Sequence, residues 1–281
     1  MTNASEPTLF RLRVAYPKLG RLKYLGHLEL IHTVEQVVRR AKLPYAVTQG
    51  FSPHMRIAYT SALPVGTSST AEYFDVYLTE LVPAEDALAR LQAAAPVDLR
   101  PIDAAYVELR RPALTAEITL VDYLIELSFS RGSGASVEKL SDVFSSWWFS
   151  NDDLQIPYRR GKKSKSLDLK RVLSQANFLP SPEGCAWVEL KTRCDNDGSL
   201  RPEILIAAFD QGLRGLAPGV DEEIVSTGIQ QLSTIESYRV ERSGQRISME
   251  NGGEAEPLGR MLEVPSGSLS RERAEWALSN L

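Results

Sequence analysis

The stretch FRLRVAY, residues 10–16, decides how the chain begins to fold. Its apolar and charged residues alternate, which is typical of a β-strand with one buried face. Leu12, Val14 and Tyr16 share that face, and two arginines occupy the opposite one. The residues that follow this strand predict the topology around it.

The apolar spacing and the prolines predict a βαββαβ order. A helix over 27–42 carries an apolar stripe and ends before Pro44, because a residue that precedes proline avoids the helical conformation. The other expected elements are strand segments around 45–48 and 56–62, a strand EYFDVYL at 72–78, a helix from Pro83 and a strand over 97–109. This order is that of a ferredoxin-like unit.

Residues 117–242 predict the same order a second time. The expected elements are a strand from Glu117, a helix with Ser136 as its N-cap, a strand CAWVELKTR at 185–193, a helix from Pro202 and a last strand that ends at Arg242. We therefore expect an α+β protein with two tandem ferredoxin-like domains, 1–112 and 113–242. Residues 243–281 are expected to form a flexible linker and a short C-terminal helix.

The composition is that of a globular protein, with 43% hydrophobic and 24% charged residues. No apolar run approaches the roughly 18 to 20 residues that span a bilayer, so no membrane association is expected. The N-terminus lacks the basic start and apolar core of a secretory signal, which predicts a cytoplasmic location. The two cysteines are too few for a zinc or iron–sulfur site of their own.

The formal net charge of −4 conceals two basic islands in an acidic body. Residues 1–56 carry a net charge of +6, and residues 158–171 also carry +6. The segment between them carries −9 and the segment after them carries −7. Local fields decide local binding, so the two islands are the candidates for contact with an anionic partner.

Within the first island, the connection VTQGFSPHMRIAY at 47–59 holds more polar groups than a hairpin turn needs. Gly50 permits a backbone conformation that other residues avoid, and Pro53 stiffens the loop. The second island, YRRGKKSKSLDLKR at 158–171, is either a solvated loop or a phosphate-binding loop. We expect the two islands to form opposite sides of one site for RNA or another anion. Its predicted residues are Lys18, Arg21, His27, Gln49, Ser52, His54, Arg56, Arg159, Arg160, Lys162, Lys163, Lys165 and Arg171.

A further candidate surface is the strand face that carries Tyr73, Asp75 and Tyr77, opposite the core stripe of that strand. In ferredoxin-like RNA-binding domains the open sheet face stacks bases. The alternative is that this face packs against the second domain.

Motifs for catalysis and cofactors do not occur. The sequence has no nucleophile elbow and no P-loop, and His27 and His32 are five residues apart, which turns them to different sides of a helix. No metal and no cofactor is therefore expected. His27 is expected to be partly buried near the start of its helix. A metal-independent ribonuclease with His27 or His54 as general base or acid is kept as an alternative.

Two blocks of sequence resemble a known bacterial family. The first is LKYLGHLELIHTVEQVVRRAKLPYAVTQGFSPHMRIAYTSALPVGTSSTAEYFDV at 22–76, and the second comprises KKSKSLDLKRVL at 162–173 and VELKTRCDNDGSLRPEILIAAF at 188–209. They resemble the radical-SAM-linked proteins, a domain of unknown function encoded beside, or fused to, a radical SAM protein. The layout also resembles that of the repeat-processing endoribonucleases of CRISPR systems, which have two ferredoxin-like domains.

This resemblance implies a radical SAM protein as partner. The chain has no C-x-x-x-C-x-x-C and therefore cannot hold a radical SAM cluster itself. With the basic islands, it leads us to expect a non-catalytic RNA-binding accessory protein that presents RNA, such as tRNA or rRNA, to that partner. A protein-interaction module without RNA binding is the second hypothesis, and the ribonuclease is the third.

Overall fold

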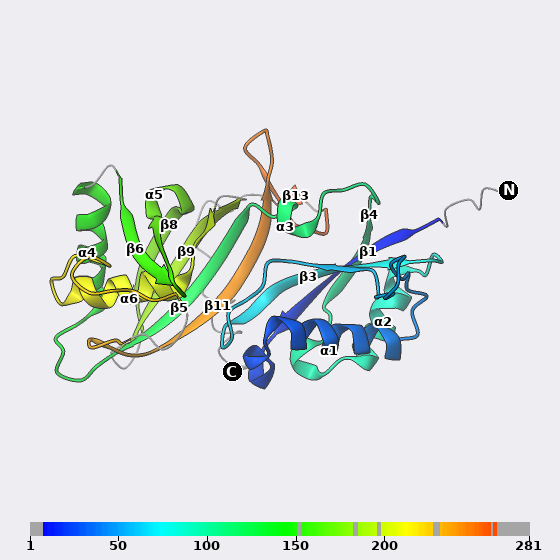
Figure 1. Ribbon diagram of the computed structural model, residues 1–281, viewed down its shortest axis with the longest axis horizontal. Helices are drawn as coiled ribbons and strands as arrows, with labels where there is room; N and C mark the ends of the chain where they lie inside the picture. The colour runs from blue at the N-terminus through cyan, green and yellow to red at the C-terminus, as the bar shows by residue number, and fades with distance from the viewer. Residues whose placement is uncertain are drawn as a thin grey trace. The chain divides into compact units, whose positions relative to one another are not determined.

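The computed structural model in Figure 1 describes residues 8–150, 153–181, 185–195, 198–226, 231–259 and 261–262. It is a mixed fold of helices and strands that divides into two compact units. Unit 1 comprises Met1–Thr119 and Arg242–Leu281, and unit 2 comprises Leu120–Glu241. Among the described residues, no helix combines the length and the apolar character needed to cross a membrane.

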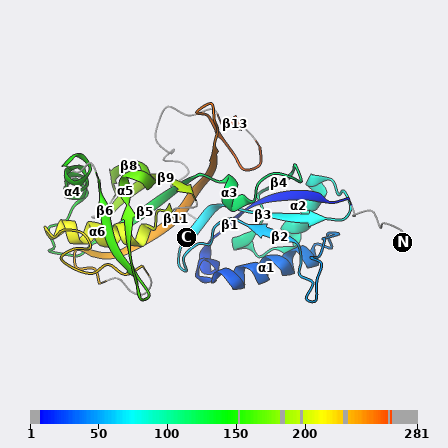
Figure 2. The same ribbon diagram turned by 45° about the horizontal axis from the view of Figure 1, so that its top comes forward.

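Unit 1 is built on β1 and β3, which pair antiparallel along most of their length. Its strands are ordered β4-β1-β3-β2, and α1 and α2 lie on one side of them (Figures 1 and 2). Its elements up to residue 119 are β1 (Phe10–Lys18), the 3-10 helix η1 (Gly20–Tyr24), α1 (His27–Arg40), β2 (Ile57–Tyr59), β3 (Ser68–Leu78), α2 (Ala84–Ala94), the 3-10 helix η2 (Val97–Leu99), β4 (Asp103–Val107) and α3 (Leu114–Glu117). The expected first strand, both helices and the strand EYFDVYL are confirmed.

The core of unit 1 lies between these strands and the two helices. Leu12, Val14 and Tyr16 are at most 2% exposed, as the alternation in β1 predicts. They belong to one cluster with apolar residues of α1 and α2, including Val38 and Leu91. Burial of a side chain of this size contributes about 1.5–3 kcal/mol, which is why the alternating pattern determines the orientation of the strand.

Unit 2 follows the order β10-β9-β5-β11, with β8 on β9 beside β10. Its elements are β5 (Leu120–Phe129), α4 (Val137–Ser150), β6 (Gln155–Arg160), β7 (Lys163–Asp168), α5 (Leu169–Val172), β8 (Leu173–Pro180), β9 (Cys185–Asp195), β10 (Gly198–Ser199), α6 (Pro202–Leu213) and β11 (Ile235–Ser248). Ser136 caps α4 as expected, since its hydroxyl accepts a hydrogen bond from the backbone N–H of Lys139. Phe144 of α4 packs against Phe178 of β8 and Phe209 of α6.

Strand β11 changes the expected ends of the domains. It continues to Ser248, so the prediction of a flexible linker from residue 243 is wrong for residues 243–248. The residues of β11 from Arg242 onward belong to unit 1, where the hydroxyl of Ser69 donates to the carbonyl of Arg242. Two short strands follow, β12 (Glu254–Ala255) and β13 (Met261–Leu262). The expected terminal helix over 270–281 lies outside the described residues.

Candidate nucleic-acid interface

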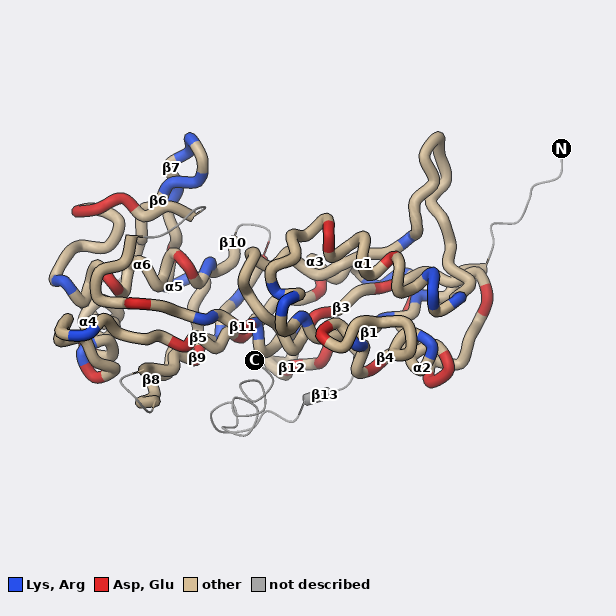
Figure 3. Tube along the Cα trace, turned by 90° about the horizontal axis from the view of Figure 1, so that it is seen from below, with Lys and Arg blue, Asp and Glu red and all other residues tan. Residues whose placement is uncertain are grey.

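The second basic island is a β-hairpin, not an irregular loop. Strands β6 and β7 pair antiparallel from Gln155–Asp168 to Arg160–Lys163, and Gly161 at the turn has a φ of +60°, which suits glycine. Ile156 and Leu167 are buried and fix the base of the hairpin in unit 2. We call residues 155–168 the cationic hairpin. In Figure 3 it protrudes from the rest of unit 2 and carries a run of blue at its turn.

The register of the cationic hairpin gathers positive charge on one face. Arg160 lies directly opposite Lys163, and Tyr158 lies opposite Lys165. Residues that face each other across an antiparallel pair, and their neighbours two positions along, share one side of the ribbon. Arg160, Lys163 and Lys165 therefore share a face, and all three are exposed, as is Lys162 at the turn.

Two cations of this island are engaged by carboxylates. Nε of Arg159, on the opposite face of the hairpin, lies 2.7 Å from Oε1 of Glu223. Arg171 follows the hairpin in α5, and its Nη2 lies 2.9 Å from Oδ2 of Asp195. Both pairs are roughly half exposed, and exposed pairs of this kind contribute little to stability. Sequence reasoning missed both pairings, because the acidic partners lie far along the chain.

The first island forms a second protruding segment, residues 47–56, which we call the finger. Val47 pairs with Met55 across it, and the backbone N–H of Thr48 donates to the carbonyl of His54. Met55 is buried at the base, while Gly50 at the tip has a φ of +142°. The finger extends beyond the end of α1 in Figure 2. The glycine and proline of this connection thus serve a narrow, structured protrusion.

The predicted donors of the finger are exposed. Gln49, Ser52 and His54 all face solvent, and the hydroxyl of Ser52 lies 3.3 Å from Nε2 of His54. Arg56 at the base places its guanidinium 4.2 Å from the centre of the Tyr77 ring. This stacking orients the cation while leaving its edge open to an anion.

Three other residues predicted from the first island lie in different environments. Lys18 is 1% exposed, and its Nζ donates to the carbonyls of Lys23 and Leu25. Burial lowers the pKa of Lys18, and the prediction that it binds an external anion is wrong. Arg21 is exposed in η1. His27 is exposed too, contrary to the partial burial expected, and its ring centroid lies 6.3 Å from that of Tyr59 in an edge-to-face arrangement.

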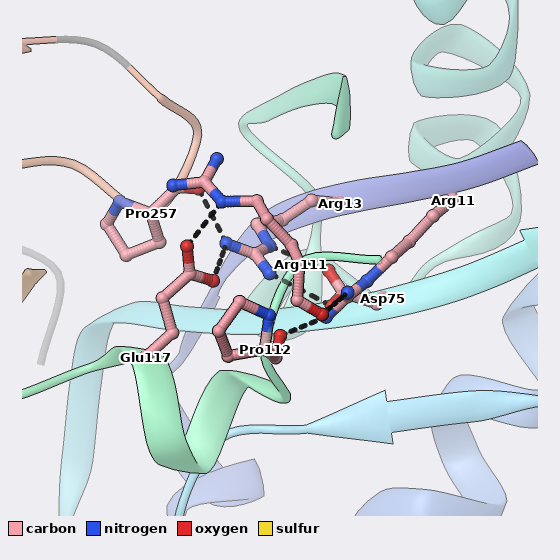
Figure 4. A network of polar contacts seen from close by, with 7 residues as sticks. All are labelled: Arg11, Arg13, Asp75, Arg111, Pro112, Glu117 and Pro257. Carbon is pink, nitrogen blue, oxygen red and sulfur yellow. Dashed lines mark hydrogen bonds and ion pairs between the residues drawn. The ribbon is translucent and has the colours of Figure 1, made fainter. Parts of the chain in front are cut away.

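The strand face with Tyr73 and Asp75 is closed rather than open. Asp75 accepts hydrogen bonds from both Arg11 and Arg13, and all three side chains are at most 2% exposed (Figure 4). Nη1 of the same Arg13 guanidinium lies 2.7 Å from Oε2 of Glu117 in α3. Tyr73 is 8% exposed, so the base-stacking role considered for it is wrong.

The cover over this face comes from unit 1 itself. Arg11 also donates to the carbonyls of Arg111 and Pro112, and Arg13 donates to the carbonyl of Pro257 (Figure 4). The segments that carry these carbonyls, before α3 and after β12, are thereby tied to β1. Packing by residues of the same unit was not among the alternatives that the sequence suggested.

The predicted site residues fall into two groups. Those of the finger belong to unit 1, and those of the cationic hairpin belong to unit 2. One exposed residue, Phe51 at the tip of the finger, was absent from the prediction, because only polar and charged groups were considered there. Its signal was an aromatic residue between a glycine and a serine–proline pair in a turn. Within the described residues, no cluster of His, Cys, Asp and Glu has the arrangement of a metal site.

Two solved structures resemble the chain weakly. One is a chain of the structure titled "Crystal Structure of a Cbf5-Nop10-Gar1 Complex", with a TM-score of 0.42, 8% identity and coverage of 83% of this chain. The match takes in 48% of that chain, about half its length. The other, "Crystal structure of putative glycine cleavage system transcriptional repressor", has a TM-score of 0.22 and 9% identity, over 83% of this chain and 98% of that one. Both TM-scores are too low to support an argument.

No curated protein matches the chain. A family model described as "Uncharacterized protein conserved in bacteria (DUF2344)" matches residues 11–202, which run from β1 to the first residue of α6. This stretch includes both the finger and the cationic hairpin. It is well over half of the sequence, and the chain therefore belongs to this conserved bacterial family, DUF2344.

Proposed function

We propose that the protein is a cytoplasmic, non-catalytic RNA-binding accessory protein that works with a radical SAM enzyme, and that the cationic hairpin holds the RNA backbone. The observation that carries the proposal is the pairing of Arg160 with Lys163, two like charges directly opposite each other on an exposed ribbon. Like charges in this position destabilise a strand pair. An arrangement that costs stability in the free protein is expected where an anionic ligand compensates it.

RNA phosphates are well suited to this face. Each phosphate that a Lys or Arg neutralises releases condensed counterions, which makes binding favourable and dependent on salt. Arg160, Lys162, Lys163 and Lys165 are exposed, so their charges are available without rearrangement of the core. A protruding ribbon also places these charges beyond the acidic body of the protein, where its negative charge repels a polyanion less.

The assignment of each unit as ferredoxin-like is part of the proposal. In unit 1 the four main strands are arranged fourth-first-third-second, as β4-β1-β3-β2. In unit 2, β11-β5-β9-β8 gives the same arrangement, with the cationic hairpin inserted after α4. Ferredoxin-like units recur among RNA-binding domains, although fold alone does not establish function.

The radical SAM partner rests on the resemblance of residues 22–76 and 162–209 to the radical-SAM-linked proteins. A tagged copy of the chain is expected to co-purify with a radical SAM protein encoded beside it, in a complex that survives ribonuclease treatment. Recovery without that protein would remove the partner from the proposal. It would leave RNA binding to be judged separately.

The RNA-binding test is fluorescence anisotropy with total tRNA and with a DNA duplex of similar length, from about 50 to 200 mM salt. We expect RNA binding that weakens steeply with salt, and a loss of about 10- to 100-fold in the triple variant R160Q/K162Q/K163Q. The matched control is R90Q/R100Q/R110Q, which removes three exposed cations from unit 1 and should bind like the wild type.

Three results would count against the proposal. Absence of RNA binding at about 50 mM salt would reject it and favour the protein-interaction module. Equal losses in the two triple variants would mean that net charge, and not the hairpin, determines affinity. A clear preference for the DNA duplex would replace RNA as the ligand.

A further inference from the structure

The finger combines one fully exposed aromatic ring with hydrogen-bond donors. Phe51 at its tip is 111% exposed relative to a reference residue, the highest value among the exposed apolar side chains of the described residues. A single exposed apolar residue is common on protein surfaces. Phe51 differs because a structured protrusion holds it away from the unit, in a turn that depends on the positive φ of Gly50.

Hydrogen bonds hold the stem of the finger together and so position the turn that carries Phe51. The backbone N–H of His54 donates to Oγ1 of Thr48, in addition to the N–H of Thr48 that donates to the carbonyl of His54. Nearer the base, the backbone N–H of Arg56 donates to the carbonyl of Ala46. The backbone N–H of Ala46 donates to the carbonyl of Tyr77 in β3. Such a stem restricts the backbone at the tip, so less backbone entropy is lost when the tip binds, which favours recognition.

The surroundings of Phe51 suit a nucleotide better than a protein or a lipid. No Asp or Glu occurs anywhere from residue 36 to residue 71, while Arg39, Arg40, Lys42 and Arg56 all do. Gln49 and His54 beside the tip offer groups that can pair with the edge of a base. An apolar docking site would instead be expected to extend over several residues, and the neighbours of Phe51 in the turn are Gly50 and Ser52.

We infer that Phe51 stacks on an unpaired nucleobase, with Arg56 at the base of the finger contacting a phosphate further along the same strand. This assigns the finger to single-stranded nucleotides, such as those of a loop or an RNA end. The assignment rests on the proposed function and extends it, since the cationic hairpin would hold the backbone without regard to pairing. Aromatic side chains and cations recur together in proteins that bind single strands.

The test compares an oligonucleotide of about 12 unpaired uridines with an RNA duplex of the same length, since single-strand sites span roughly 4–16 nucleotides. We expect F51A to weaken binding of the single strand by about 5- to 160-fold, the range that loss of one stacked base produces. Duplex binding should change little. F51W should restore single-strand binding, because indole stacks at least as well as phenyl.

A salt titration separates the two residues of the finger. F51A should leave the slope of log K against log salt unchanged, because phenyl contacts no phosphate. R56Q should reduce the magnitude of that slope by about one, because one phosphate contact and the counterion it releases are lost. A DNA single strand of the same length distinguishes recognition of the base alone from recognition of RNA.

Each outcome decides between the two proposals. If the wild type binds neither probe at about 50 mM salt, the proposed function and this inference both fall. If the wild type binds and F51A binds the single strand equally well, only the inference falls, and the proposed RNA binding stands. An unchanged thermal midpoint for F51A shows that a loss of binding does not reflect unfolding.

Discussion

Arg13 and Arg160 are the same residue type in opposite circumstances. Arg13 is fully buried in unit 1, between the carboxylates of Asp75 and Glu117 at 2.7 Å each. Arg160 is exposed on the cationic hairpin of unit 2 and faces another cation, Lys163. A buried charge persists only when it is matched, because desolvation costs several kcal/mol for each ion. An exposed, unmatched charge costs little and is available to a ligand, so pairing and burial divide the arginines by role.

The largest effect is expected from the buried side of this comparison. Asp75→Ala would leave Arg11 and Arg13 without their shared carboxylate, and breaking a buried pair in this way costs about 3–5 kcal/mol. The free energy of unfolding, measured with urea, should fall by that amount. The control is Glu80→Ala, an exposed carboxylate of the same unit. Equal unfolding midpoints for the two variants would mean that the ion network does not support the fold.

The alternation of β1 made its core face predictable, while the role of its other face was not. Apolar periodicity identifies Leu12 and Val14 as core residues from their immediate neighbours alone. The burial of Arg13 depends on Asp75, Glu117 and Pro257, which are 62, 104 and 244 residues away along the chain. A local pattern carries no information about such distant partners, so the sequence left two alternatives for this face and suggested neither the ion pairs nor the cover that the structure shows.

The same limit applies to the candidate site. The charge of residues 158–171 was readable, but the register that brings Arg160 opposite Lys163 depends on Gly161 forming a two-residue turn. The exposure of Phe51 could not be predicted either. Whether an aromatic residue in a turn is buried depends on its neighbours in the folded chain, which the local sequence does not reveal. Lys18 counted as a binding residue for its charge, although its position at the end of a buried strand determines its environment.

A second prediction concerns high pH and tests the buried region again. Burial, with Glu72 nearby, raises the pKa of Tyr16 well above its ordinary value of 10, and burial likewise raises the pKa of Tyr73. The unfolded chain therefore loses these protons first, and stability falls as pH rises above 10. Each tyrosine with a raised pKa lowers the free energy of unfolding by about 1 kcal/mol for each pH unit above its unfolded pKa.

Denaturation followed at several pH values checks this prediction. The fall in the free energy of unfolding between pH 10 and pH 11 should be smaller by about 1 kcal/mol in Tyr16→Phe, which lacks one of the phenolic protons that the folded protein retains. A slope that Tyr16→Phe leaves unchanged would show that Tyr16 already ionises normally in the folded protein.

A third prediction turns to the exposed side. The triple variant R160Q/K162Q/K163Q should change the free energy of unfolding by less than about 0.5 kcal/mol, as is usual for surface substitutions. A small gain is expected rather than a loss, because the variant removes the repulsion between residues 160 and 163. A loss of more than about 1 kcal/mol would mean that the hairpin cations stabilise the fold, as Arg13 does, and the contrast between the two groups would not hold.

The last prediction concerns a cation that is exposed but paired, between the two classes. Arg159 is exposed but held by Glu223, so Glu223→Gln would release a further positive charge on the cationic hairpin. RNA affinity should rise about 2- to 5-fold, and the slope of log K against log salt should steepen by about one ion. Glu222→Gln is a closely matched control, since it removes the same charge from the next residue, whose partner is Arg214. An equal rise in both variants would attribute the gain to net charge, whereas a rise in Glu223→Gln alone would show that pairing with a carboxylate is what keeps an exposed arginine from its ligand.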